Sequence, residues 1–257
     1  TNEFCLLIGA TAKGRKGTSL SHVRHLFREV DRAWVRARQK TGLSSGEGLK
    51  WAVRDPIERT KRDGETETVD EGIADKRLLV VEGEFASALQ VMERRGNTLS
   101  ACIRNLWDNG SVGSLTKNDA VEVTDAHVSM VGHITKDELL RYLTSTELGN
   151  GFANRYIYVC VRRSKCLPFG GSLNPCELEG PLQQLREAVE FAREIGEMGL
   201  NADAREMWEK VYPSLSDGKP GLLGCVLSRS EAHVRRLACI YALLDHSCTV
   251  TEVHLRA

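Results

Sequence analysis

The residues best suited to chemistry lie near the start of the chain, where a loop combines glycines with basic and hydroxyl side chains. Its candidate phosphate-binding residues are three glycines, an Arg-Lys pair and two hydroxyl residues: Gly9, Gly14, Gly17, Arg15, Lys16, Thr18 and Ser19. In a phosphate cradle, glycines let backbone N–H groups approach the phosphates, lysine reaches the terminal phosphates, and a hydroxyl at the helix start ligates magnesium. Gly9 and Gly14 have the spacing of the pattern G-x-x-x-x-G-K-[ST]. Arg15 takes the lysine position of that pattern, and Lys16 follows one residue later.

Two regular elements must position this loop. The apolar run from Phe4 to Ile8 is short and bounded by glycine, which is typical of a buried strand. After the loop, apolar residues recur at helical spacing from Leu20 to Ala37, so we expect one helix that runs to about Gln39. Strand, glycine loop and helix is the order that a phosphate cradle requires. The alternative is a glycine-rich turn between a strand and a basic helix.

A carboxylate pair follows the next strong strand. Leu78 to Val81 is a run of four aliphatic residues, and it leads directly into Glu82, Gly83 and Glu84. A buried strand that delivers a carboxylate opposite a phosphate loop is a magnesium-ligand arrangement, and Glu82 is its first carboxylate. The alternative is a core strand with a charged exit.

Two further strands place polar side chains near their ends. The run from Ala126 to Ile134 ends with His133 and Thr135, where a strand tip can touch a phosphate. A buried histidine with satisfied hydrogen bonds is the alternative for His133. The turn Gly149 to Arg155 is rich in glycine and displays one arginine before the strand Tyr156 to Val161. A plain turn arginine is the alternative for Arg155.

The remaining chain reads as helices and loops. A capped helix is expected from Ser45 through Val53, a polar loop or mobile insertion over residues 55–76, and an antiparallel hairpin over 112–123. Other predicted helices lie near residues 85–92, 97–110, 137–142, 182–198, 202–212 and 228–244, with a loop over 213–223. We predict an α/β core over residues 1–165 with a central, mostly parallel sheet, followed by a mainly helical subdomain over 166–257.

Composition and charge narrow the class of protein. Of the 257 residues, 27% are charged and 41% are hydrophobic, which is ordinary for a globular protein. No apolar run approaches the ~20 residues of a membrane span. The eight cysteines form no C-x-x-C pair, and no histidine or cysteine cluster has zinc-ligand spacing. A disulfide framework is not expected in a chain of this length with a phosphate loop, which favours a reducing, cytoplasmic setting. Residues 10–62 carry 14 Lys/Arg against 5 Asp/Glu, which permits a nucleic-acid surface, although solvated helix faces give the same pattern.

Taken in order, these motifs resemble a RecA-like P-loop ATPase core, of the helicase-like family associated with primases of phages, plasmids and other mobile elements. The resemblance covers the chain almost end to end, and the order and spacing of the motifs carry it. The matching stretches are residues 14–19, the Leu-Leu-Val-Val-Glu-Gly-Glu-Phe block at 78–85, 106–108, 132–134, 151–156 and 235–238. The chain opens inside a strand and closes inside a predicted helix, so we expect it to be a piece of a longer protein.

The resemblance implies a set of roles for the candidate residues. Lys16 would contact the β- and γ-phosphates of ATP, with Arg15 as an additional contact. Thr18 or Ser19 and the carboxylate of Glu82 would hold Mg²⁺. The remaining implied roles are a base that orients the attacking water (Glu84, or Glu47 as a rival), a γ-phosphate sensor (His133 or Thr135) and an arginine finger (Arg155). Positioning and charge neutralisation by such groups suffice for phosphoryl transfer.

Three functional hypotheses follow. The first is an ATPase motor domain that acts on DNA, expected to be single-stranded, in the replication of a mobile element. Its expected partners are a primase or replication protein and further copies of itself in a ring, without a membrane. The second is a nucleotide-gated module that binds DNA or a primase with little or no hydrolysis. The third is a nucleotide-dependent assembly protein without nucleic acid.

Overall fold

A computed structural model describes residues 1–10, 14–61, 63–113, 121–171 and 174–257. Contacts between residues divide the chain into two compact units. Unit 1 comprises residues 1–16 and 36–161, and unit 2 comprises residues 17–35 and 162–257. The division falls near the predicted boundary at 165, and it additionally assigns residues 17–35 to the second unit.

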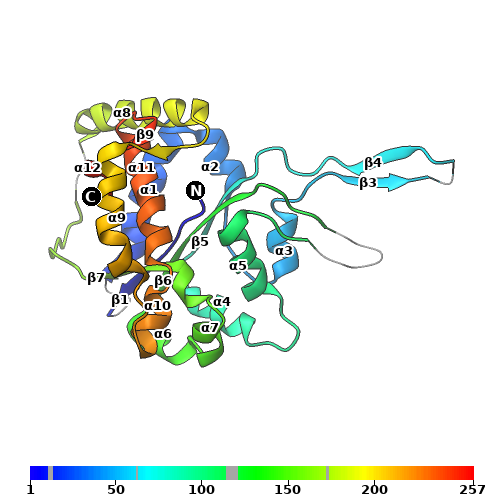
Figure 1. Cartoon of the computed structure of the whole chain (residues 1–257), viewed down its shortest axis with the longest axis horizontal. Coiled ribbons are helices and arrows are strands. Elements are labelled where there is room, and N and C mark those ends of the chain that lie inside the picture. The colour runs from blue at the N-terminus through cyan, green and yellow to red at the C-terminus, as the bar shows by residue number, and fades with distance from the viewer. Residues whose placement is uncertain (11–13, 62, 114–120, 172–173) are drawn as a thin grey trace. The chain divides into compact units, whose positions relative to one another are not determined.

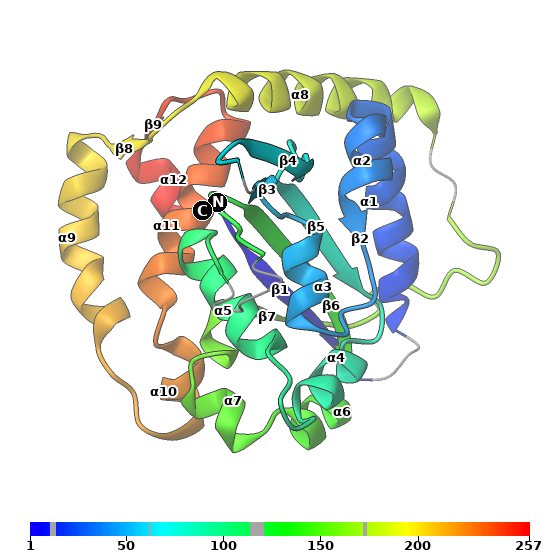
Figure 2. The same cartoon turned by 90° about the vertical axis from the view of Figure 1, so that its right-hand side faces the viewer.

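Unit 1 is built on a five-stranded parallel sheet, with the strand order β2-β5-β6-β1-β7 (Figure 2). The strands are β1 (Phe4–Gly9), β2 (Gln39–Lys40), β5 (Arg77–Glu82), β6 (His127–Thr135) and β7 (Tyr156–Val161). β1, the first strand of this sheet in the chain, lies between β6 and β7, the last two strands of the same sheet, and pairs with both. The α/β class and the parallel sheet are confirmed, and so are the four longer strands.

One face of this sheet carries the core of unit 1. The helices α4 (Phe85–Met92) and α5 (Leu99–Asn109) pack on β6, and α3 (Gly46–Trp51) packs on α5. Four aromatic rings meet there, with the Tyr156 ring centred 5.3 Å from Phe4, 5.4 Å from Phe85 and 5.0 Å from Phe152. Gly132 on β6 is required for this packing, because an added Cβ would lie 2.7 Å from the Phe85 ring.

The polar segment 55–76 forms a hairpin, so the prediction of a loop or mobile insertion is wrong. Its strands are β3 (Ile57–Thr60) and β4 (Thr66–Asp70), which pair antiparallel. The hairpin extends away from α3 and α5 of the same unit (Figure 1). A second predicted hairpin, over 112–123, is represented by one antiparallel bridge between Val112 and Val123, and residues 114–120 lie outside the described residues.

The helix predicted to run to about Gln39 is two helices. They are α1 (Lys16–Val30) and α2 (Arg32–Arg38), and Asp31 lies between them. The Asp31 carboxylate accepts a hydrogen bond of 2.9 Å from the backbone N–H of Trp34, as an N-terminal cap does. A capping side chain inside an otherwise helical apolar pattern therefore ends one helix and begins the next.

Three short helical elements complete unit 1. They are α6 (Lys136–Tyr142), α7 (Ser145–Gly149) and the 3-10 helix η2 (Ala153–Arg155). The predicted helix from Ser45 is confirmed: the Ser45 hydroxyl accepts a hydrogen bond from the Gly48 N–H at 3.0 Å.

Unit 2 is mainly helical, and α11 packs against α8, α9 and α12. Besides most of α1 and the start of α2, its elements are α8 (Pro175–Glu194), β8 (Gly199–Leu200), α9 (Ala202–Ser216), α10 (Gly221–Leu227), α11 (Ser230–Leu244), β9 (Thr249–Val250) and α12 (Glu252–Arg256). The loop predicted over 213–223 is wrong, because α9 continues past Pro213 and α10 begins at Gly221. Segment 17–35 is joined to α8 by an ion pair of 2.9 Å between Arg193 and Asp31.

Candidate nucleotide site

The candidate residues of unit 1 follow the carboxyl edge of the parallel sheet. Gly9, the last residue of β1, pairs with Thr135 at the end of β6 and with Val161 at the end of β7. Glu82 ends β5, but it pairs with Gly132 and therefore stops three residues short of the end of β6. The structure thus brings Gly9 and Thr135 together and leaves Glu82 level with a β6 residue three positions before Thr135.

The chain leaves this edge in opposite directions from two neighbouring strands. After β1 it continues to β2 on one side of the sheet order, and after β6 it continues to β7 on the other. In open parallel sheets, ligands bind outside the carboxyl ends of the strands at such a switch point. The loop after Gly9 therefore begins where this architecture places a ligand.

The described part of this loop is Gly14, Arg15 and Lys16, while residues 11–13 lie outside the described residues. Arg15 has a φ of 53°, in the left-handed region that non-glycine residues seldom adopt. Such backbone costs about 1–3 kcal/mol and concentrates at ligand sites. Among the described residues, an added Cβ at Gly14 would meet only Lys16 Cγ, at 4.0 Å, so these residues leave the space beside Gly14 open.

Lys16 begins α1 and lies close enough to Glu138 to influence that residue's ionisation. The pKa of Glu138 is lowered first by its hydrogen bonds with Thr135 and then by the positive charge of Lys16. Glu138 was not among the predicted residues. The spacing Thr135-x-x-Glu138 is that of a capping box, and this spacing could have identified Glu138 from the sequence.

Thr135 is the N-terminal cap of α6, and both its hydroxyl and its backbone N–H interact with Glu138 in this cap. Its hydroxyl lies 2.8 Å from the Glu138 carboxylate, and its backbone N–H donates to the same carboxylate at 3.0 Å. His133 is only 4% exposed. It pairs along the sheet with Leu7 of β1, two residues before Gly9, so it lies beneath the switch point.

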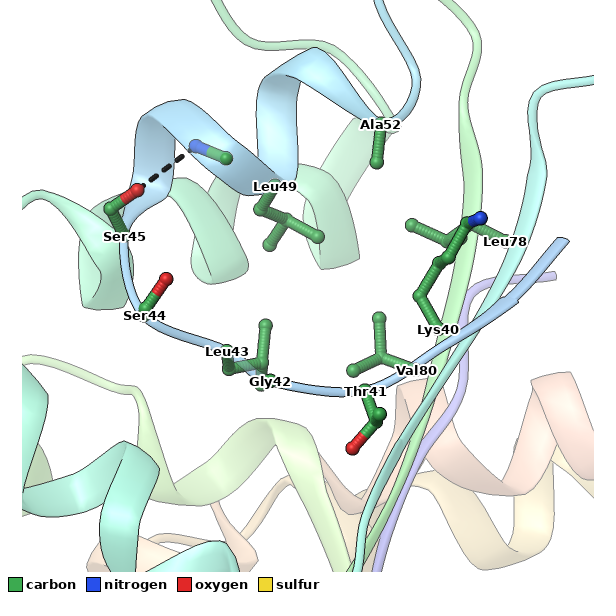
Figure 3. Close-up of a pocket in the computed structure, with 11 residues that line it drawn as sticks. Lys40, Thr41, Gly42, Leu43, Ser44, Ser45, Leu49, Ala52, Leu78 and Val80 are labelled. Carbon is green, nitrogen blue, oxygen red and sulfur yellow. Dashed lines mark hydrogen bonds between the residues drawn. The ribbon is translucent and has the colours of Figure 1, made fainter.

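The Glu82 carboxylate holds the loop between β2 and α3. Its Oε1 accepts hydrogen bonds from the backbone N–H groups of Gly42, at 2.5 Å, and Leu43, at 2.8 Å. Within the described residues, Oε2 of Glu82 has no hydrogen-bond partner. The same loop lines a cavity of about 130 Å³ that also borders β5, where Ser44 and Ser45 lie opposite Leu78 and Val80, and Thr41 lies beside Val80 (Figure 3).

The two candidate bases lie in different surroundings. Glu84 is exposed at the start of α4, and its side chain makes no capping hydrogen bond. Glu47 lies in the first turn of α3 and accepts a hydrogen bond of 2.7 Å from the Thr98 hydroxyl. That bond, with a smaller contribution from the backbone, lowers the pKa of Glu47. The Glu47 carboxylate therefore joins α3 to α5 through Thr98, while the Glu84 side chain makes no hydrogen bond within the described residues.

Arg155 is buried, which corrects the expectation that its turn displays it outward. It is 5% exposed, and its Nη2 donates to the Asp108 carboxylate at 2.6 Å. Its Nη1 donates to the Gly151 carbonyl, and its guanidinium carbon lies 5.6 Å from the centre of the Trp107 ring. The reason is a carboxylate at the end of α5 that sequence spacing could not pair with the turn.

The remaining cradle residues, Gly17, Thr18 and Ser19, lie in the first turn of α1 and belong to unit 2. That turn contains no acidic residue, so its N–H groups and positive dipole are not opposed by a carboxylate of the same turn. The Ser21 hydroxyl donates to the backbone carbonyl of Thr18 at 2.7 Å. This bond does not involve the Thr18 hydroxyl.

The residues present fit a nucleotide with its magnesium ion. Within unit 1, the open space beside Gly14 and the cation of Lys16 suit a phosphate chain. Among the described residues, no group of three or more His, Cys, Asp and Glu side chains is arranged to hold a metal ion. Magnesium in nucleotide sites is commonly held by one or two carboxylates together with the phosphates, so a single carboxylate of unit 1, such as Glu82, is sufficient.

Comparison with known proteins adds no assignment: no family model matches the chain, and no curated protein matches it. None of the helices in the described part of the chain has both the length and the apolar character needed to cross a membrane.

Proposed function

We propose that this chain binds ATP at the carboxyl edge of its parallel sheet and hydrolyses it as a helicase-like RecA-type motor domain. The motor would act on DNA during the replication of a mobile element. The observation that carries the proposal is the switch point at the end of β1, from which a loop with an open glycine and a strained Arg15 leads into Lys16.

Within this proposal, Lys16 neutralises the β- and γ-phosphates, and Arg15 adds a second cation. Thr18 or Ser19 supplies the hydroxyl ligand of magnesium, since they lie two and three residues after Lys16 in the chain. Glu82 supplies the carboxylate through Oε2 while Oε1 keeps the loop of Gly42 in place. Magnesium, when bound, offsets the negative charge that develops on the phosphate oxygens.

Glu84 is the better candidate for the residue that orients the attacking water. It is exposed and uncommitted, whereas Glu47 is bound to Thr98. His133 is a candidate sensor of the terminal phosphate, because it lies on β6 beside β1. Arg155 could act as an arginine finger only after its bond to Asp108 opens, so it is the weakest member of the proposed set.

A second candidate function is a nucleotide-gated module that binds DNA or a primase with little hydrolysis. The buried position of Arg155 favours it, because an arginine finger contributes ~10³–10⁵ to the rate of phosphoryl transfer. Turnover separates the two functions. A motor releases phosphate continuously and faster with single-stranded DNA, while a gated module binds ATP without sustained release.

The first experiment is a titration with a fluorescent ATP analogue. Lys16→Ala should abolish tight binding, since the phosphates lose their nearest cation. Lys165→Ala, which removes an exposed lysine of unit 2, is the matched control and should bind as the unaltered chain does. Unchanged affinity in Lys16→Ala would place the cradle elsewhere and make Arg15→Ala the next variant.

The second experiment addresses the carboxylates and the assembly. Glu84→Gln should retain ATP binding and lose phosphate release, and Glu82→Gln should weaken the magnesium dependence of binding. Normal phosphate release by Glu84→Gln would move the base to Glu47. Light scattering with ATP, alone and with single-stranded DNA, tests the proposed ring. A mass that stays monomeric during normal turnover would exclude the ring.

A further inference from the structure

A second cavity of unit 1, about 550 Å³ in volume, lies along β2, between the end of α3 and the base of the β3–β4 hairpin. Its charged and aromatic lining consists of Arg38, Lys40, Trp51, Arg54 and Asp75, and the rest is formed by glycine, alanine and isoleucine. None of these residues belongs to the candidate nucleotide site. A cavity of this volume is in the range that encloses a small ligand.

Trp51 presents a fixed aromatic surface at this cavity. Its side chain is 48% exposed, although an indole is among the groups that gain most from burial. The Arg54 guanidinium lies 3.9 Å from the centre of the ring, and two hydrogen bonds to Asp70, of 2.9 and 2.8 Å, hold that guanidinium. The ring is therefore supported by a cation and oriented before any ligand arrives.

Arg38 places a buried cation in the lining of the same cavity. It is 7% exposed, and its Nε and Nη2 donate to the carbonyls of Arg77, at 3.1 Å, and Ala52, at 2.9 Å. Its Nη1 has no hydrogen-bond partner within the described residues. Burial lowers the pKa of Arg38, while the charge of Asp75 raises it, and the group stays charged at neutral pH.

The carboxylates near the cavity are committed to other partners. Asp75 binds Arg77 through both of its oxygens, at 2.8 and 2.7 Å, and Asp70 binds Arg54. The Lys40 side chain is exposed and makes no hydrogen bond or ion pair with any residue that the structure describes. The cavity therefore offers two cationic groups, Lys40 and Arg38, without a carboxylate in contact with either.

The wall formed by the base of the hairpin is rigid. The backbone N–H of Ile73 donates to the Arg54 carbonyl at 2.9 Å. Gly72 has a φ of +66°, and a Cβ there would lie 2.5 Å from the backbone of Asp55 and Pro56. Only glycine allows this close crossing of the two chains. The cavity is thus a constructed feature of the fold and not an opening between loosely packed loops.

We propose that this cavity binds one nucleotide unit of a single-stranded nucleic acid, with the base stacked on Trp51 and the phosphate between Lys40 and Arg38 Nη1. Single strands are held by this combination of an aromatic surface and cations. A paired duplex keeps its bases stacked inside and cannot supply one to the ring. The inference rests on the proposed function only for its choice of nucleic acid over other anionic ligands.

The experiment is a fluorescence-anisotropy titration of a labelled oligothymidylate with the whole chain, in buffer without ATP. Trp51→Leu should weaken binding by about tenfold, and Trp51→Phe should restore most of it, because stacking needs a ring. Lys40→Ala should lower the slope of log affinity against log salt by about 0.7, the value for one phosphate contact on a single strand. Tyr212→Ala, which removes an aromatic residue of unit 2 that is 45% exposed, is the control and should change nothing.

The outcomes decide the assignment independently of ATP. Equal affinity of Trp51→Leu and the unaltered chain would overturn it, and so would the absence of any oligonucleotide binding. Displacement of the oligonucleotide by free thymidine monophosphate at an equal base concentration would reassign the cavity to a mononucleotide. Equal competition by polyglutamate would reduce it to a general anion site. Because no ATP is present, loss of ATP binding in Lys16→Ala leaves this result unaffected.

Discussion

Removing the guanidinium of Arg155 tests whether this residue braces the fold of unit 1. Arg155→Ala eliminates a charged hydrogen bond to Asp108 and a second one to the Gly151 carbonyl. A hydrogen bond that involves a charged group contributes about 1.5–3 kcal/mol, and breaking a fully buried ion pair costs about 3–5 kcal/mol. Asp108 is 34% exposed and can be rehydrated after the change, which reduces the penalty. We therefore expect a loss of about 2–3 kcal/mol.

Thermal unfolding followed by circular dichroism measures this loss. For a chain of this size, 1 kcal/mol corresponds to about 2–4 °C in Tm, so Arg155→Ala should unfold about 4–12 °C earlier. Arg163→Ala, which removes an exposed arginine, is the control and should stay within about 0.5 kcal/mol of the unaltered chain. A double-mutant cycle with Asp108→Ala isolates the pair. An unchanged Tm together with lost hydrolysis would refute the bracing role and support the arginine finger.

Three further predictions address packing, pH and thiol reactivity. Gly132→Ala should destabilise the chain by about 1–3 kcal/mol through overpacking, while Gly149→Ala, where an added Cβ meets nothing within 4 Å, should not, as denaturant titration would show. Because the pKa of Glu138 is lowered from 4.5, its stabilising effect is present above about pH 4.5 and is lost as pH falls through the lowered pKa. The stability difference between Glu138→Gln and the unaltered chain should therefore disappear in acid. Burial raises the pKa of Cys102 to about 12, so a thiol reagent at mildly alkaline pH should spare it until the chain unfolds. The same reagent should modify the four exposed cysteines, Cys160, Cys166, Cys176 and Cys248.

The parts of the fold that the sequence predicted are those with a strong local apolar signal. The strands β1, β5, β6 and β7 are apolar runs that local composition defines. The β3–β4 hairpin has no such signal, because its residues are mostly threonine and charged residues and its exposed strands pair only with each other. Ion pairs such as Lys61 with Glu67, at 3.2 Å, join across it, and pattern reading does not detect such pairing.

The sequence predicted the order of the candidate site residues along the chain, but it did not predict which residues these side chains contact. The phosphate loop and Glu82 follow from strand ends, which sequence can locate. The partner of Arg155 is 47 residues away, so the burial of that arginine depends on tertiary packing alone. The stacking of Arg54 on Trp51 was also missed, although an aromatic residue inside the basic segment 10–62 was a visible signal.

The position of β1 affects how this chain can fold during synthesis. Its two sheet neighbours, β6 and β7, are the last strands of unit 1 to leave the ribosome. Residues 17–35 likewise emerge long before residues 162–257, with which they form unit 2. Many proteins fold from the N-terminus as they are made, but here neither unit has its full set of partners until residue 161 has been synthesised. Until that point β1 lacks at least one of its two sheet neighbours, and the helix within residues 17–35 lacks most of the segment with which it forms unit 2.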